Sequence, residues 1–389
     1  MKLIADYLAE LIKAHLENRV PSSVPVGVTV EEIIRIAGKQ HMNYLLLGSL
    51  IKADNITQKE TEKLRAFVIG SLMQTVSQTN EIKKLQECCE KKKIINQPMK
   101  GARLKSIYPL PQMREMSDID ILIRKEDMDK FATELKEMGY SLKQSIKHHD
   151  IYIKPHHLVV EAHRAMYDKT VDKTQYQYFL DRSKTQLMEG CQYTYNFNPE
   201  DFYIYMLSHM AKHFYVMGCG VRNLVDIYIY RNAYRGKLDE TYLNGELERC
   251  QILNFTKHME KLAFIWLDGE KETDFYNDVF DYMLDSGVYG KDENGIWNKF
   301  SEKTINSNEE KRFHLAKWYY FPPLYYMVEY YPWLEKKPFL LPAAWMIRGI
   351  RGFFMDKGVK KRHMIREINT EKIETLRKIY QEMNLHFDI

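Results

Sequence analysis

The chain has 389 residues, which suggests roughly two or three domains and excludes a small disulfide-stapled protein. Lysine and arginine number 57 against 53 aspartates and glutamates, so the net charge of +4 argues against a protein that binds nucleic acid over its whole surface. The five cysteines form no C-x-x-C pair, which indicates reduced thiols. Since no segment has the continuous apolar character of a signal peptide or a membrane span, we expect a cytoplasmic protein without a transmembrane segment.

Residues 1–92 are expected to form an N-terminal helical region. Thr29 and Thr57 are each followed three residues later by a glutamate, the pattern in which both side chains satisfy free amides of a first helical turn. After Thr57, apolar residues recur at helical spacing toward Leu85. We interpret this region as a helical bundle or lid.

Around residue 94 the pattern changes to short apolar runs. It predicts a strand at residues 119–123 and a helix at residues 128–138 that stops at Gly139. It also predicts a hairpin whose strands are residues 152–154 and 158–160. An earlier strand begins at Ile94 but runs into Pro98, which cannot donate a hydrogen bond inside a sheet, so we expect it to be short, bulged or at an edge. Residues 93–195 are therefore expected to form a small α/β unit.

The rest of the chain, residues 196–389, is expected to be a C-terminal helical domain. Asn198-Pro199 is a typical helix start, and helical signals continue after it. The aromatic residues clustered between 318 and 333 are interpreted as packing residues. The apolar stretch 338–354 contains two arginines and is interpreted as a core helix, with a membrane-surface helix as the alternative.

Two alternating aspartates carry the chemistry. In a strand over 119–123, Asp118 and Asp120 project from one face, and the isoleucines between and after them point to the other. Carboxylates held this closely repel each other, and a divalent cation relieves the repulsion. Glu161, on the second strand of the expected hairpin, is a candidate for a third carboxylate at the same place.

Basic residues precede this strand. Lys100-Gly101 lies where the chain is expected to turn into a helix, whose free amides can receive a phosphate. Lys100, Arg103 and Arg114 are expected to add positive charge there.

The motifs K-G-A-R-L, Y-P, R, S-D-I-D-I-L-I, V-V-E-A-H and H-M-A-K-H-F, followed by G-C-G-V-R-N-L-V-D-I, lie between Lys100 and Asp226. In this order they resemble an uncharacterised bacterial family of the polymerase-beta-type nucleotidyltransferase superfamily, nucleotidyltransferase family 5. The resemblance implies an α+β fold, in which a small mixed-sheet nucleotidyltransferase core is flanked by N-terminal and C-terminal helical regions. It also implies transfer of a nucleoside monophosphate from an NTP to a hydroxyl acceptor, with release of pyrophosphate.

The resemblance further assigns roles to residues. Asp118, Asp120 and Glu161 are expected to be catalytic and to hold two Mg²⁺ ions, or Mn²⁺ in their place. The residues expected to bind the nucleotide are Lys100, Gly101, Arg103, Arg114 and Lys212.

Several histidines have two interpretations. His209 and His213 have a spacing that zinc sites use, but we interpret them as part of a packing face with satisfied imidazoles. His163 either lines the site or packs in the core.

One helical turn separates Arg222 from Asp226, and these two residues are expected to form an ion pair on a helix surface.

Two other functions stay open. His149-Asp150, together with the pair His209 and His213, suggests a metal-dependent phosphohydrolase. A non-catalytic nucleotide-binding or scaffold protein on the same fold is the other alternative, although the presence of all three carboxylates argues against it. The acceptor is a small molecule, a protein or an RNA end, and the net charge argues against RNA. The NTP and the oligomeric state are not specified.

Overall fold

The computed structural model describes residues 2–146, 148–155, 158–168, 173–180, 182, 186–271, 273–291, 294–295, 317, 320–354 and 370–387. The chain divides into two compact units, residues 1–290 with 383–389, and residues 291–382. Both boundaries expected from the sequence, near residues 92 and 195, lie inside the first unit and stay predictions. The division at residue 290 was not expected.

The N-terminal part of the first unit is helical. Its elements are α1 (Lys2–Leu16), α2 (Val30–Gln40), the π-helical turn η1 (Asn43–Leu47), α3 (Gly48–Leu50) and α4 (Gln58–Lys92). The helix starts follow the sequence signals. At α4, Thr57 accepts a hydrogen bond from the amide of Glu60, whose carboxylate accepts one from the amide of Thr57, and at α2 Thr29 accepts from the amide of Glu32.

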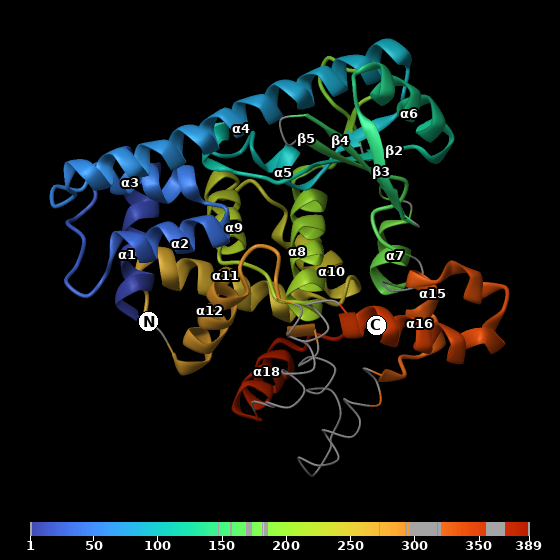
Figure 1. The fold of residues 1–389 in the computed structure, drawn as a ribbon. Coiled ribbons are helices and arrows are strands. Elements are labelled where there is room, and N and C mark those ends of the chain that lie inside the picture. Colours follow the sequence, from blue (N-terminus) through green and yellow to red (C-terminus); the bar gives the residue numbers. More distant parts are fainter. Residues whose placement is uncertain are drawn as a thin grey trace. The chain divides into compact units, whose positions relative to one another are not determined.

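Helix α4 extends from these helices to the sheet (Figure 1). It faces the sheet with a buried carboxylate, Glu81, which accepts hydrogen bonds from Tyr140 and Lys154, each at 3.0 Å. One turn later, Leu85 and then Cys89 enter the core beneath the sheet. The helix therefore joins the N-terminal region to the α/β core.

The core is a five-stranded mixed sheet. Its strands are β1 (Asn96–Pro98), β2 (Ile119–Ile123), β3 (Ser141–Ser145), β4 (His149–Lys154) and β5 (Leu158–His163), in the order β1-β2-β5-β4-β3. Strands β2 and β5 are parallel, and the other neighbours are antiparallel. Helices α5 (Lys100–Leu104) and α6 (Met128–Glu137) follow β1 and β2. The short first strand lies at an edge as expected, because Pro98 removes a ladder donor.

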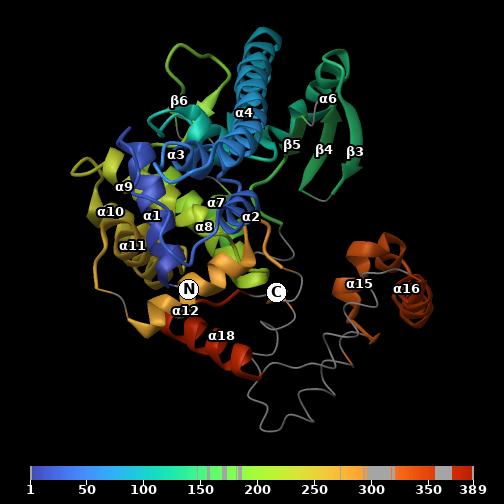
Figure 2. The same ribbon diagram turned by 60° about the vertical axis from the view of Figure 1, so that its left-hand side comes forward.

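The helix 128–138, the strand 119–123 and the hairpin are confirmed, whereas β3 was not expected. All five residues of β3 are exposed, and Leu142 has 56% of its surface exposed, so the strand has no alternation of apolar and polar residues to reveal it. Figure 2 shows β5, β4 and β3 side by side, with α6 against them.

The two faces of the sheet differ. Ile119, Ile121 and Ile123 pack on one face against Phe131 and Leu135 of α6. This is the alternation expected from the sequence, and it leaves Asp120 and its neighbours on the opposite face. That face is turned away from α6 and toward α8 (Figure 1).

Short elements lead from the sheet to a helical layer. They are α7 (Lys173–Phe179), β6 (Gln186–Leu187) and β7 (Tyr195–Asn196), followed by α8 (Pro199–Val216), α9 (Arg222–Ala233), α10 (Glu240–Arg249), α11 (Leu253–Asp268) and α12 (Asp274–Ser286). Asn198 caps α8 as expected, by accepting from the amide of Asp201 at 2.7 Å.

Many tyrosines in the first unit donate a hydrogen bond to a buried or half-buried carboxylate. Tyr203 donates to Glu260 at 2.6 Å, and Tyr178 donates to Glu246 at 2.7 Å. Rings also stack, as Tyr203 does on Tyr230 with centroids 5.1 Å apart. Much of the surplus of tyrosine is thus used in packing, and these phenols donate to carboxylates.

The second unit contains α15 (Leu324–Tyr330), η4 (Pro332–Glu335), η5 (Pro338–Leu340), α16 (Leu341–Phe354) and all but the last residue of α18 (Thr370–Met383). Tyr331 lies in its small core, which confirms packing for part of the aromatic cluster, and Trp318-Tyr319 lies outside the described residues. In α16, Ala344 is buried but Met346 is 66% exposed, so the helix is buried on one side only. Within the described ranges, no helix is long and apolar enough to cross a membrane.

Candidate active site

The pairing of three strands brings the candidate residues together. In the parallel pair, Asp120 of β2 lies opposite Glu161 of β5. In the antiparallel pair, His149 of β4 lies opposite His163 of β5. Residues directly opposite each other point to the same face, as do residues two apart on one strand. One face of the sheet therefore carries two carboxylates and two imidazoles side by side.

Asp120 is the centre of this group. It is 3% exposed, and its Oδ1 lies 2.6 Å from Nζ of Lys100 and 2.8 Å from Nε2 of His163. Burial alone would raise the pKa of Asp120, but Lys100 and His163 outweigh it and hold the pKa well below its usual value. Asp120 is thus an ionised carboxylate in a buried position.

Lys100 is held in place by an unusual turn. Its φ of 45° lies in the left-handed region, and the amide of Met99 donates to the carbonyl of Asp120 at 3.0 Å. The next residue, Gly101, is closely packed: a Cβ there would lie 3.2 Å from Cβ of Met116, so a side chain would require Met116 to shift. Burial disfavours the ammonium of Lys100, but Asp120 raises its pKa above the usual value, so the ion pair is charged. A strained non-glycine residue that points at a carboxylate is typical of a functional turn.

The third carboxylate lies close by. Nε2 of His163 is 3.4 Å from Oε2 of Glu161, so this imidazole touches both Glu161 and Asp120. Each of Asp120, Glu161 and His163 offers one ligand atom, and these atoms lie within 4.8 Å of one another, so the group could hold a metal ion. His163 therefore lines the site, which decides between its two interpretations.

Asp118 is the remaining predicted carboxylate. It is half-buried just before β2, and burial together with the charge of Asp120 raises its pKa to about 6. It is outside the group whose ligand atoms lie within 4.8 Å, but the charges of Lys100 and Glu161 also act on it. The three carboxylates thus lie together with one lysine, and negative charge is in excess.

Helix α8, which carries the predicted ligand Lys212, also contributes a row of side chains to the site. Tyr205, His209 and His213 are four residues apart and share one face, and the imidazoles lie 3.1 Å apart between their Nε2 atoms. Burial, and then the charge of Lys100, lowers the pKa of His213 to about 3, which keeps the imidazole neutral. These histidines contact each other as a packing pair does, but they also face the charged group.

Tyr205 has a buried hydroxyl without a hydrogen-bond partner among the described residues. Burial raises the pKa of this phenol, and Lys100, Asp120 and Glu161 all act on it electrostatically. A buried hydroxyl without a partner is unusual in a folded protein and is a common feature of binding sites. The spacing of Tyr205, His209 and His213 is the signal that could have found it.

A family model described as an uncharacterised nucleotidyltransferase matches residues 27–268. The chain belongs to this family. The matched range contains the whole sheet and helix α8, and it confirms the resemblance seen in the motifs and the α+β core with flanking helices. No curated protein and no solved structure matches the chain.

In this member of the family, one predicted nucleotide ligand has another partner. Arg114 forms a buried, two-pronged ion pair with Asp226 of α9, at 2.6 Å and 2.9 Å, and Tyr108 donates to the same carboxylate. The expected surface pair of Arg222 and Asp226 is therefore wrong, because Asp226 is buried and forms its ion pair with Arg114. Arg222 instead donates to the carbonyl of Glu115 at 3.1 Å.

Tyr108, Arg114, Arg222 and Asp226, which all lie in the motifs, thus contact one another or the same segment and do not contact the carboxylates of the site. Glu115, beside Arg114, accepts hydrogen bonds from the amide of Tyr44 and from the side chain of Asn43. The segment before β2 is thus tied to η1 on one side and to α9 on the other. The phosphate contact predicted for Arg114 stays a prediction, and it would require the guanidinium to leave Asp226.

Two other predicted nucleotide ligands lie over aromatic rings. The guanidinium of Arg103 lies over the ring of Phe202 at 5.9 Å, and Nζ of Lys212 lies over the ring of Tyr167 at 5.5 Å. None of the five cysteines is in a disulfide, as expected. His156 and His157, between the hairpin strands, lie outside the described residues.

A cavity of about 400 Å³ lies at the end of β2. Its described lining includes Gln97, Leu122 and the rings of Tyr167 and Phe179. Leu122 is two residues beyond Asp120 on the same face of β2, although Asp120 itself does not line the cavity. A second cavity of about 420 Å³, against α9 and α11, contains none of the predicted site residues.

Proposed function

We propose that this chain transfers a nucleoside monophosphate from an NTP to a hydroxyl acceptor, with pyrophosphate as the leaving group. In this reaction the acceptor oxygen bonds to the α-phosphorus, the bond between the α-phosphorus and the bridging oxygen breaks, and a carboxylate or a metal-bound group takes the hydroxyl proton. The observation that carries the proposal is that buried Asp120 and half-buried Glu161 lie opposite each other on one sheet face, with Lys100 beside Asp120.

The donor set fits a divalent cation. Asp118, Asp120 and Glu161 supply the oxygens that Mg²⁺ and Mn²⁺ prefer, and their negative charge exceeds the single positive charge of Lys100. Burial raises the pKa of Asp118, and the negative charges of Asp120 and Glu161 contribute to the same shift. Mg²⁺, when bound, would neutralise charge on the triphosphate and on the departing pyrophosphate.

Charged residues of the chain would position the NTP. Lys100 supplies the positive charge next to the carboxylates, and we assign it to the phosphates, with Gly101 allowing close approach of the chain. Arg103 and Lys212 remain proposed nucleotide ligands, whereas Arg114 is left out because Asp226 occupies it. Catalysis of this kind depends mainly on positioning and charge stabilisation.

The cavity at the end of β2 suits the nucleoside. Both polar atoms of the Gln97 side chain are buried and have no partner among the described residues, and the side chain is 2% exposed. An amide offers a donor and an acceptor to a base edge. We therefore place the base there.

The test uses the full chain with each of the four α-labelled NTPs, Mg²⁺ or Mn²⁺, and a cell lysate as the acceptor pool. Label transfer to a protein or to a small molecule identifies the acceptor class. We expect Asp120→Asn to abolish transfer and the exposed Asp129→Asn on α6 to retain it. Unchanged transfer by Asp120→Asn would contradict the proposed site.

The non-catalytic alternative is distinguished by the same samples. A scaffold protein would bind an NTP in calorimetry, and that binding would respond to changes at Lys100, but no label would reach any acceptor. The phosphohydrolase alternative predicts release of inorganic phosphate or of a nucleoside phosphate without any labelled acceptor.

A further inference from the structure

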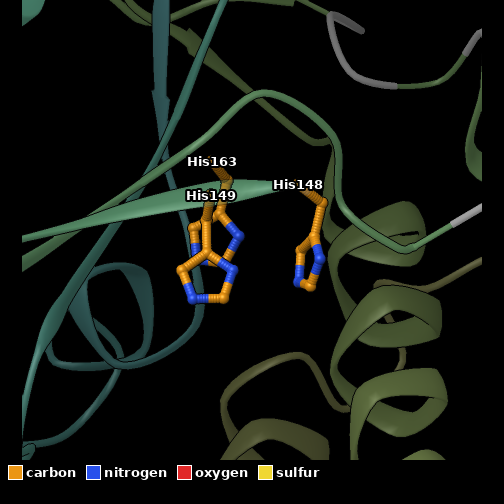
Figure 3. A group of neighbouring side chains, drawn as sticks. All are labelled: His148, His149 and His163. Carbon is orange, nitrogen blue, oxygen red and sulfur yellow. The ribbon is translucent and has the colours of Figure 1, made fainter. Parts of the chain in front are cut away.

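Three histidines next to the carboxylates have no role in the proposed transfer. His148 and His149 lie at the start of β4, and His163 ends β5 (Figure 3). The ring centroid of His149 lies 4.5 Å from that of His148 and 4.9 Å from that of His163. The amide of Arg164 donates to the carbonyl of His148 at 2.8 Å, which fixes His148 beside the end of β5.

The ring nitrogens of this cluster are poorly satisfied. The Nδ1 atoms of all three histidines are buried and have no hydrogen-bond partner among the described residues. Nδ1 of His148 lies 3.7 Å from the nearer oxygen of Asp168, which is beyond hydrogen-bond distance. A single buried polar atom without a partner is uncommon. Three such atoms on neighbouring imidazole rings point to a ligand that the rings share.

The separations suit one metal ion. Each histidine offers one nitrogen, and these nitrogens lie within 4.8 Å of one another. Two nitrogens bound to one tetrahedral zinc ion at about 2.0–2.1 Å lie roughly 3.4 Å apart, so rotation of the rings by a small amount brings them to ligand distance. The strand pairing already places His149 opposite His163.

We propose that His148, His149 and His163 bind one transition-metal ion of the zinc class, beside the carboxylate group. Three neutral imidazoles with an open fourth position form a donor set that zinc, cobalt, nickel and iron accept, whereas Mg²⁺ prefers oxygen. This site is distinct from the oxygen donors of Asp118, Asp120 and Glu161, and its existence does not depend on nucleotidyl transfer.

The surroundings of His163 support a role as ligand. Its Nε2 lies 2.8 Å from Asp120, and with the proton on Nε2 the ring donates to this carboxylate and leaves Nδ1 for the metal. A histidine that ligates through one nitrogen and donates to a carboxylate through the other is the usual arrangement in metal sites.

The experiment titrates the chelator-treated full chain with Co²⁺, whose visible absorption reports nitrogen coordination, and then displaces Co²⁺ with Zn²⁺. With millimolar Mg²⁺ present to occupy the carboxylates, we expect one Co²⁺ per chain and its displacement by Zn²⁺. His148→Ala and His149→Ala should each weaken Co²⁺ binding by about tenfold or more. The matched control is His258→Ala on α11, whose binding should equal that of the unaltered chain.

Two further variants make the result specific. Asp118→Asn should keep the Co²⁺ spectrum although it loses nucleotidyl transfer, so failure of one proposal does not imply failure of the other. Thermal unfolding checks that each variant folds, and His149→Asn replaces His149→Ala if the alanine variant does not. Equal Co²⁺ affinity in the unaltered chain and in the double variant His148→Ala/His149→Ala, including no binding by either, overturns the proposal.

Discussion

The buried ion pair between Arg114 and Asp226 should be essential for stability. The side chains are 7% and 2% exposed, two hydrogen bonds join them at 2.6 Å and 2.9 Å, and Tyr108 donates to the same carboxylate. Asp226→Ala removes the partner of a guanidinium that stays buried. Breaking such a pair from one side costs about 3–5 kcal/mol, a large part of the roughly 5–15 kcal/mol that stabilises an ordinary folded protein.

The assay is urea denaturation followed by circular dichroism, with the dependence on urea compared between variants to verify that the same surface is exposed on unfolding. The matched control is Glu31→Ala, which breaks an exposed pair with Lys63 and should leave the unfolding free energy unchanged within error. Arg114→Ala should destabilise to a similar extent as Asp226→Ala. A loss below about 1 kcal/mol in both, together with a raised KM for NTP in Arg114→Ala alone, would refute the structural role and restore the predicted phosphate contact.

Three further outcomes follow from single groups. Thr57→Ala removes the cap of α4 and should lower the unfolding free energy by about 1 kcal/mol in the same urea assay. Burial lowers the pKa of His41 to about 4, so between about pH 6.5 and pH 4 only the unfolded chain takes up this proton. The free energy of unfolding should therefore fall as the pH drops through that window. In His41→Gln, the difference between the urea midpoints at pH 7 and pH 5 should be smaller. Lys100→Met should keep the fold, as judged by circular dichroism, but reduce label transfer by about a hundredfold or more, and full activity would remove Lys100 from the site.

The sequence was sufficient where alternation decides the outcome. Isoleucines at every second position of β2 had to face the core, so Asp118 and Asp120 had to face away from it. The same argument placed Glu161 on its strand, and the pairing of Asp120 with Glu161 confirms that the two carboxylates meet. Local signals of this kind need no knowledge of distant contacts.

The sequence was insufficient where distant segments choose their partners. Asp226 is one helical turn from Arg222 but pairs with Arg114, which lies 112 positions earlier, and helical spacing alone favours the nearer arginine. The contact of His149 with His163 depends on the register of two strands, which a sequence does not fix by itself. Strand β3 has no apolar face and therefore no pattern to detect.

The central claim is that the carboxylate group supports nucleotidyl transfer rather than phosphoryl transfer or hydrolysis. The most direct measurement incubates the chain with one NTP labelled at the α-phosphate and, in parallel, at the γ-phosphate, with the acceptor pool and Mg²⁺. We expect the α-label on an acceptor and the γ-label in pyrophosphate, with both signals lost in Glu161→Gln. Label from the γ-phosphate on the acceptor, or equal α-label transfer by Glu161→Gln, would contradict the account.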